Sequence, residues 1–127
     1  MIRIDARSST PIYEQIIIKI KELILKGIIK PGEKLPSVRE LSSIITANPN
    51  TVSKAYGELE RDGVIESLRG RGTFVVEDYK PIFSDKKFEK IKEELKKIML
   101  EAKYLGLKKE DLIKALNECF NDMEGEN

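Results

Sequence analysis

The sequence predicts a mainly α fold with a small β-hairpin, an α+β arrangement, on two observations. Apolar residues recur every three or four positions through most of the chain, which is the period of helices with one buried face. Two short runs rich in β-branched and aromatic residues, 64–68 and 73–76, flank the basic, glycine-rich segment 69–72. Two such runs joined by a glycine-containing turn are typical of a β-hairpin.

Composition excludes several classes of protein. The chain has 127 residues, which is enough for about one domain, and it contains no apolar run long enough to cross a membrane. It has no histidine and one cysteine, Cys119, which excludes an intrachain disulfide framework, the usual zinc sites and histidine-based catalysis. The N-terminus lacks the apolar core of a signal peptide. We therefore expect a cytoplasmic protein with no metal, no cofactor and no membrane contact. An enzyme is the weakest alternative, and we expect no enzymatic activity, because no phosphate-binding loop precedes a helix.

The first expected helix begins at Pro11, with Thr10 as its N-cap, and Gly27 marks its end. Its apolar side chains are assigned to the core and lie at helical spacing: Ile12, Ile16, Ile20, Leu23 and Ile24.

The connector 29–36 contains a Pro-Gly turn and a short extended piece near Leu35. Ser37 and Glu40 then form a capping box that opens a short helix ending near Thr46. The side chains expected to point inward from this helix are Val38, Leu41, Ile44 and Ile45.

A third helix is expected over about 49–62, with Asn48 as its cap, Pro49 in its first turn and Gly63 as its stop. Its apolar face contains Val52, Ala55, Tyr56 and Leu59. Its other face contains Asn50, Thr51, Ser53, Lys54 and Gly57. That outer face is small, polar and uncharged except for the lysine, whereas a solvated helix more often carries a mixture of Glu and Lys.

After a hinge at 78–81, a long helix is expected over 84–104 and a last helix over 107–123, with Gly106 as the break and 124–127 as a frayed tail. The long helix carries a heptad seam of apolar residues: Phe88, Ile91, Leu95, Ile98, Ala102 and Leu105. One face of the last helix carries Leu112, Leu116, Phe120 and Met123.

The net charge of +1 conceals a difference between the two parts of the chain. Through Val76 there are 12 Lys and Arg against 9 Asp and Glu, and from Glu77 onward there are 11 against 13. The basic excess therefore belongs to the first part, which suggests two modules with different roles. We expect a domain at 1–78 and a two-helix segment at 79–127.

A helix, a short helix, a sharp turn, another helix and a basic hairpin follow one another in the order of a winged helix-turn-helix. In that fold the second helix of the helix-turn-helix enters the major groove and presents its N-terminal side chains to base edges. Asparagine can pair with adenine, and lysine can reach guanine or phosphate. The arginines of the hairpin supply charge for the DNA backbone or the neighbouring minor groove.

Three motifs in this order resemble the signature of the GntR family of bacterial transcription regulators. They are 31–41 (PGEKLPSVREL), 48–63, which begins NPNTVSKAY and ends LERDG, and 69–75 (RGRGTFV). The Asn-Pro-Asn-Thr-Val turn and the short two-helix tail are similar to the YtrA-like subfamily in particular. Members of that subfamily are often repressors of operons that encode ABC transporters, which is the biology that the resemblance implies.

The resemblance also implies which residues bind double-stranded DNA. By position in the motifs they are Ser37, Arg39, Asn48, Asn50, Thr51, Ser53, Lys54, Arg69, Gly70, Arg71, Gly72 and Thr73. One departure changes the expected base preference: many family members carry an arginine in the turn where this chain has Pro49.

A single winged helix reads only a half-site, so we expect a homodimer on a palindromic operator. The expected dimer interface contains Phe88, Ile91, Leu95, Ile98, Ala102, Leu105, Leu112, Leu116 and Phe120. Larger family members carry an effector domain, but two helices leave no room for an enclosed pocket of ordinary size, so the effector is unknown.

Other interpretations remain open at this point. Arg39 alternatively pairs with Glu40 or Glu60 on the surface, and Asn50 and Thr51 alternatively serve only the turn and the helix cap. The last two helices alternatively pack on their own winged helix. The whole chain is alternatively a winged-helix protein-interaction module, although such a module is expected to expose apolar residues where this helix exposes polar ones.

Overall fold

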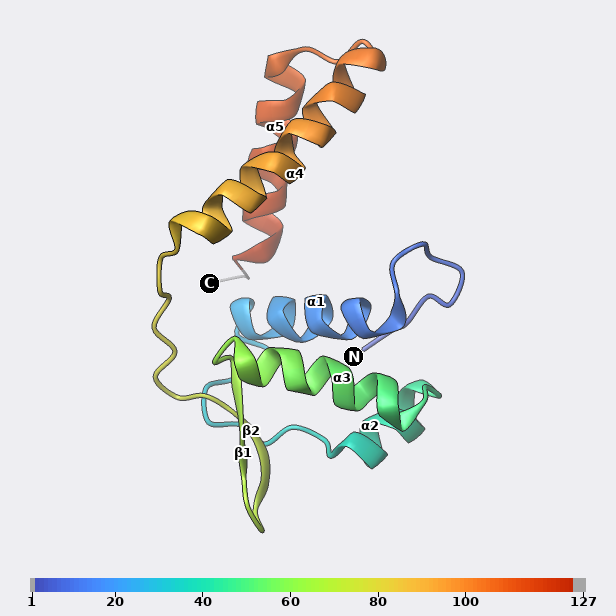
Figure 1. Ribbon diagram of the computed structural model, residues 1–127, viewed down its shortest axis with the longest axis vertical. Coiled ribbons are helices and arrows are strands. Elements are labelled where there is room, and N and C mark those ends of the chain that lie inside the picture. Colours follow the sequence, from blue (N-terminus) through green and yellow to red (C-terminus); the bar gives the residue numbers. More distant parts are fainter. Residues whose placement is uncertain (1, 125–127) are drawn as a thin grey trace. The chain divides into compact units, whose positions relative to one another are not determined.

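The computed structural model describes residues 2–124, and these residues confirm the predicted mainly α fold with one small hairpin. Their elements in chain order are α1 (Ile12–Leu25), α2 (Val38–Ile45), α3 (Pro49–Arg61), β1 (Ile65–Leu68), β2 (Gly72–Val75), α4 (Asp85–Tyr104) and α5 (Lys109–Met123) (Figure 1). The chain divides into two compact units, 2–79 and 80–124, which are described separately. The end of the expected tail, 125–127, lies outside the described residues.

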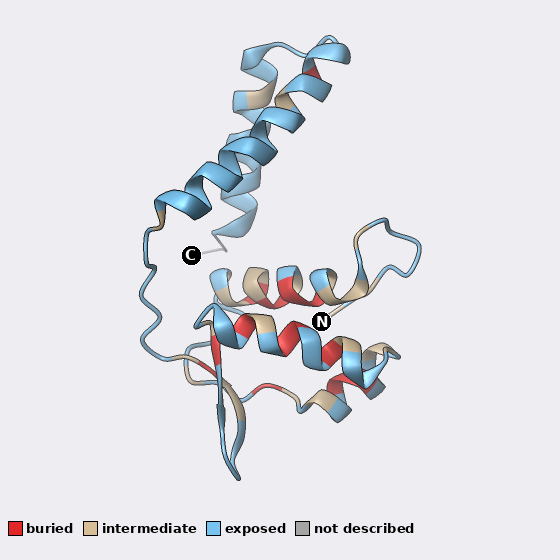
Figure 2. Cartoon of the chain, viewed as in Figure 1, coloured by how far each residue is buried: buried red, intermediate tan, exposed pale blue. Residues whose placement is uncertain are grey.

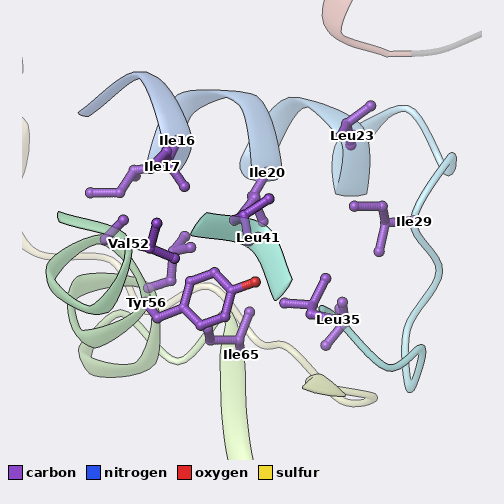
Figure 3. Close-up of a cluster of buried hydrophobic side chains, with 13 residues drawn as sticks. Ile16, Ile17, Ile20, Leu23, Ile29, Leu35, Leu41, Val52, Tyr56 and Ile65 are labelled. Carbon is purple, nitrogen blue, oxygen red and sulfur yellow. The ribbon is translucent and has the colours of Figure 1, made fainter. Parts of the chain in front are cut away.

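The first unit has one hydrophobic core, which α1, α2 and α3 share with the hairpin (Figure 3). α1 and α3 run side by side, and Ile16, Val52 and Leu59 between them are completely buried. Leu35 from the connector and Ile65 from β1 complete the core. Burying a side chain of this size contributes roughly 1.5–3 kcal/mol, so the helix periodicity of the sequence is explained by this one core.

The N-terminal boundary of α1 differs from the sequence prediction. Thr10 does not cap the helix; Pro11 occupies the N-cap position with an extended ψ of 148° and makes no side-chain cap. The side chain of Gln15 instead holds the preceding chain, because its amide donates to the Thr10 carbonyl at 2.8 Å and to the Asp5 carbonyl at 2.9 Å. The predicted stop is confirmed, since Gly27 has a φ of +74° directly after the cap residue.

α2 begins as predicted but presents a narrower face to the core. Ser37 and Glu40 form the capping box, whereas Ile44, predicted to point inward, is 67% exposed. A helix of eight residues has only about two turns, so only a few of its side chains can reach the core. Leu41 and its half-buried neighbours, Val38 and Ile45, make this contact. Ser42 is buried in place of an apolar residue, and its hydroxyl donates to the Ala47 carbonyl.

The connector pairs with the hairpin. β1 and β2 are antiparallel, with Leu68 opposite Gly72, and Lys34 forms a β-bridge with Phe74 on the outer side of β2. The Leu35 N–H donates to the Thr73 carbonyl at 2.8 Å. The extended piece predicted near Leu35 is thereby confirmed, and it ties the start of α2 to the hairpin.

The second unit contains α4 and α5. Ser84 caps α4, and Gly106 breaks the chain after it with a φ of +81°. α5 begins at Lys109 and not at Leu107 as predicted, because the Asp111 carboxylate accepts from the Lys108 N–H at 2.8 Å and sets the start there. Among the described residues of this unit only Ala102 is buried (Figure 2). None of the helices described in the chain is long and apolar enough to cross a membrane.

Candidate nucleic-acid interface

The first turns of α3 present the polar face that the sequence singles out. Asn48 caps the helix with its Oδ1, which accepts from the Asn50 N–H at 2.8 Å. Asn50 and Ser53 are exposed, and Thr51 is half-buried. Pro49 fits the first turn because it needs no hydrogen-bond donor there. Two free polar side chains and one half-covered threonine therefore stand at the start of this helix.

Lys54, on the same face, has an aromatic neighbour from α1. Its Nζ lies 3.8 Å from the centre of the Tyr13 ring, within the range of a cation–π contact. The Lys54 side chain is exposed, and Tyr13 is half-buried. The sequence analysis did not identify Tyr13, because the two residues are far apart in the chain and meet only when α1 packs on α3.

The start of α2 brings Arg39 to the surface beside a fixed carboxylate. The Ser37 N–H donates to Glu40 Oε1 at 3.2 Å, and Ser37 Oγ accepts from the Glu40 N–H at 3.1 Å. The Ser37 backbone N–H, followed by the Ser37 side chain and the nearby charge of Lys34, holds the pKa of the Glu40 carboxylate below its ordinary value of 4.5.

The hairpin tip carries two exposed arginines, Arg69 and Arg71, with Gly70 between them. The Arg71 N–H donates to the Leu68 carbonyl at 2.9 Å, and Gly70 has a φ of +77°, a conformation that glycine adopts at little cost. Within residues 2–124, no salt bridge includes Arg69, Arg71 or Arg39. Their positive charge is therefore not neutralised by a carboxylate in contact.

Lys34 is a further basic side chain near the tip that the sequence analysis did not identify. A Cβ built on Gly72 would lie 2.8 Å from Lys34 Cε, so the lysine stem passes directly over this glycine. Lys34 reaches this position because the connector is bridged to β2. The only sequence signal for it is a basic residue two positions before the proline that precedes the capping box.

Family comparison identifies the first unit. Residues 12–75 match the model of the bacterial regulatory proteins of the gntR family, which is half of the chain. The chain is also 59% identical to the HTH-type transcriptional repressor YtrA of Bacillus subtilis (strain 168) over 98% of its own length and 96% of that protein's. The chain belongs to the GntR family. It is thus a winged-helix transcription regulator and not an enzyme.

Solved structures extend the comparison to the whole length of this GntR-family regulator. A transcriptional antiterminator from Listeria monocytogenes EGD-e is 44% identical, with a TM-score of 0.90, and the match covers 100% of this chain and 95% of that one. The DNA-binding domain of AraR, in complex with an operator, is 33% identical, with a TM-score of 0.52, over 57% of this chain and 90% of that one. The second likeness is confined to about the length of the winged helix.

The residues that the resemblance assigns to DNA differ in how available their side chains are in this GntR-family regulator. Those with exposed side chains are Ser37, Arg39, Asn48, Asn50, Ser53, Lys54, Arg69 and Arg71. Thr51 and Thr73 are half-buried, so only part of each side chain is accessible. Tyr56, interpreted from the sequence as a core residue, is buried, and its hydroxyl donates to the Pro36 carbonyl at 2.7 Å. Arg61 lies 3.9 Å from Glu58 in an exposed ion pair.

The residues assigned to a dimer interface also divide into two groups. Within one chain the exposed ones are Phe88, Ile91, Leu95, Ile98, Leu105, Leu116 and Phe120. Ala102 is buried and Leu112 is half-buried within the chain itself. These two side chains are therefore less available to a partner than the sequence analysis assumed.

Proposed function

We propose that this regulator is a cytoplasmic homodimer that binds a palindromic operator and represses transcription. The recognition helix, about 49–62, reads base edges, and the wing, 69–73, binds the DNA backbone or the minor groove. The observation that carries this proposal is the combination of a polar, exposed start of α3 with arginines that have no salt bridge within residues 2–124. An arginine without a carboxylate partner is free to bind a phosphate, and each such contact releases a condensed counterion from the DNA.

The second unit supports the homodimer. Large apolar side chains of α4 and α5, such as Leu95, Ile98 and Phe120, are 47–60% exposed in a single chain. Apolar surface of this extent is unusual for a monomer and is typical of an interface. A second copy fits it, because two-fold pairing places two winged helices on the two halves of a palindrome.

Repression is favoured by the YtrA protein of Bacillus subtilis, whose name describes a transcriptional repressor. Control of an ABC-transporter operon follows from the subfamily resemblance. A protein-interaction module is not favoured, since the outer face of α3 is polar where a protein-binding surface would be apolar.

The first experiment is a fluorescence anisotropy titration of the full chain with the duplex upstream of its own gene. We expect tight binding that weakens steeply as salt rises from about 50 to 200 mM, because phosphate contacts release counterions. Arg39→Ala should nearly abolish this binding, and Arg61→Ala, outside the assigned contacts, serves as the matched control. Binding that does not depend on salt, or no binding to any duplex, would contradict the proposal.

Asn50→Ala tests base readout separately. Removing an amide that pairs with a base should cost about 1–3 kcal/mol at the operator and relax selectivity at one or two base pairs. The measurement is the ratio of affinities for the operator and for duplexes substituted at single positions. An equal loss on every duplex would show that Asn50 does not read sequence.

A further inference from the structure

We propose that Tyr13 is a positioning residue that holds the Lys54 ammonium, by a cation–π contact, for binding a DNA phosphate. This inference rests on the proposed function and deepens it, because it assigns Lys54 to the DNA backbone and not to a base, and it adds a residue of α1 to the interface. The observation that carries it is the 3.8 Å separation between Lys54 Nζ and the centre of the Tyr13 ring.

The position of Lys54 around α3 indicates phosphate as its target. Lys54 follows Thr51 by three residues and precedes Glu58 by four, and both of those residues are half-buried, so all three lie along one flank of the helix. The opposite side of α3 is the buried one, where Tyr56 belongs to the core. Lys54 lies on the outer face of α3, and its contact with Tyr13 directs its ammonium toward α1 and away from Ser53.

The kind of contact preserves the charge that DNA needs. Lys21 on α1 lies 3.2 Å from the Asp62 carboxylate, which neutralises it. Lys54 has no salt bridge within residues 2–124, and an aromatic ring attracts an ammonium without cancelling its charge. The Tyr13 hydroxyl points to Glu14 Oε1, at 3.3 Å, so the ring face is the part of Tyr13 that meets Lys54.

Holding the side chain in place also reduces the entropy that binding would otherwise lose. Lysine has a flexible four-carbon stem, and ordering such a side chain at an interface lowers the net affinity. Tyr13 orders the Lys54 stem before DNA arrives. We expect this to improve affinity for every duplex equally, since phosphates carry no sequence information.

The test is a double-mutant cycle with Tyr13→Leu and Lys54→Met, measured by anisotropy on the operator and on an unrelated duplex. Tyr13→Leu should weaken binding about two- to fivefold for each subunit bound. Lys54→Met should weaken both duplexes by the same factor and reduce the slope of log affinity against log salt by about one per subunit. In the Lys54→Met background, Tyr13→Leu should have no further effect.

Tyr13→Phe is the matched control, because it keeps the ring and removes only the hydroxyl; it should bind like the wild type. Thermal unfolding of each variant separates lost binding from lost folding, and Lys54→Met remains informative if Tyr13→Leu does not fold, because Lys54 is exposed.

Three results would each overturn the inference. If Tyr13→Phe loses as much as Tyr13→Leu, the hydroxyl and not the ring acts. If the effect of Tyr13→Leu persists without Lys54, the two residues are not coupled. If Lys54→Met weakens only the operator, Lys54 reads a base. Failure of the proposed function is distinct from these, since the wild type would then bind neither duplex.

Discussion

The two units of the molecule bury their apolar residues in different ways. In the first unit, side chains from α1, α2, α3, the connector and the hairpin meet in one core, where Ile16 and Leu59 are fully covered. In the described part of the second unit, α4 and α5 bury only Ala102 and leave large residues such as Phe88 exposed. Apolar residues recur at helical spacing in both units, but only the first unit buries them within a single chain. The comparison teaches that the first unit is stabilised internally, whereas the second leaves apolar surface of the kind that the proposed second copy would cover.

The charged side chains of α4 also differ from the arginines of the candidate interface. In the first unit Arg39 and the wing arginines have no salt bridge among the described residues, whereas α4 pairs Lys92 with Glu89 and Lys97 with Glu94 at 3.1–3.2 Å. Exposed ion pairs of this kind contribute only a few tenths of a kcal/mol, but they neutralise the helix surface. The first unit also has two ion pairs, Lys21 with Asp62 and Arg61 with Glu58, so the contrast is between α4 and the arginines of the candidate interface, whose charge no carboxylate in contact neutralises.

The largest expected effect comes from the core of the first unit. Leu59→Ala removes a completely buried side chain and should lower the free energy of unfolding of that unit by about 3 kcal/mol, through lost burial and the cavity left behind. Urea unfolding followed by circular dichroism measures it. Leu116→Ala, which truncates a leucine that is 53% exposed in α5, is the matched control and should leave the first unit unchanged. Equal losses for both variants would mean that the two units share one core.

Breaking the second unit should affect assembly more than folding of the first. Ile98→Glu places a charge in the apolar seam of α4, at a side chain that is 55% exposed in one chain. We expect a monomer whose affinity for a palindromic operator falls by roughly 100-fold, because the second half-site is no longer tethered. Sedimentation velocity and anisotropy measure the two effects. Lys97→Ala, one residue away, should leave both unchanged; a dimeric Ile98→Glu protein would contradict the assignment of this surface.

Local signals were sufficient to predict most of the fold. The Ser37 capping box, the Asn48 cap before Pro49 and the stops at Gly27 and Gly63 are all confirmed, because each depends on residues within about one turn. The sequence did not determine which of the two adjacent isoleucines of α2, Ile44 and Ile45, packs against the core. Ile44 was predicted to be buried, although only tertiary packing determines which side of so short a helix meets the core.

Motifs in the sequence predict candidate residues that one element presents by itself, but they do not predict side chains that meet across elements. Exposure of Asn50 and of the wing arginines agrees with their assignment from the sequence. Tyr13 and Lys34 had no local signal, since one depends on the packing of α1 on α3 and the other on the pairing of the connector with β2. Whether a second copy covers the heptad seam depends on an interaction outside the single chain.

The pH dependence of stability compares a buried tyrosine of the first unit, Tyr56, with an exposed tyrosine of the second, Tyr104. Burial, followed by the charge of Glu40, raises the pKa of Tyr56 to about 12 from an ordinary value of 10.0. The folded state thus favours the protonated hydroxyl, so its contribution is complete below pH 10 and is lost as the pH rises from 10 to 12. The stability difference between wild type and Tyr56→Phe should shrink by about 1–2 kcal/mol over that range. Tyr104→Phe, at an exposed position in α4, should show no such change.

The smallest expected effect tests whether the two units unfold independently. A Cβ added to Gly57, inside α3, meets no atom within 4 Å, so Gly57→Ala should stabilise the first unit by about 0.5–1 kcal/mol through the better helix propensity of alanine. Gly63→Ala is the matched control: it also has free space, but its φ of +75° strains any side chain, so it should destabilise the same unit. In the absence of DNA, both variants should move the unfolding transition of the first unit alone. Because a dimeric second unit melts in a concentration-dependent way, its transition is recognisable by dilution. If that transition moves with either glycine variant, folding of the second unit depends on the first. The two units would then differ in how they bury apolar side chains but not in whether they fold independently.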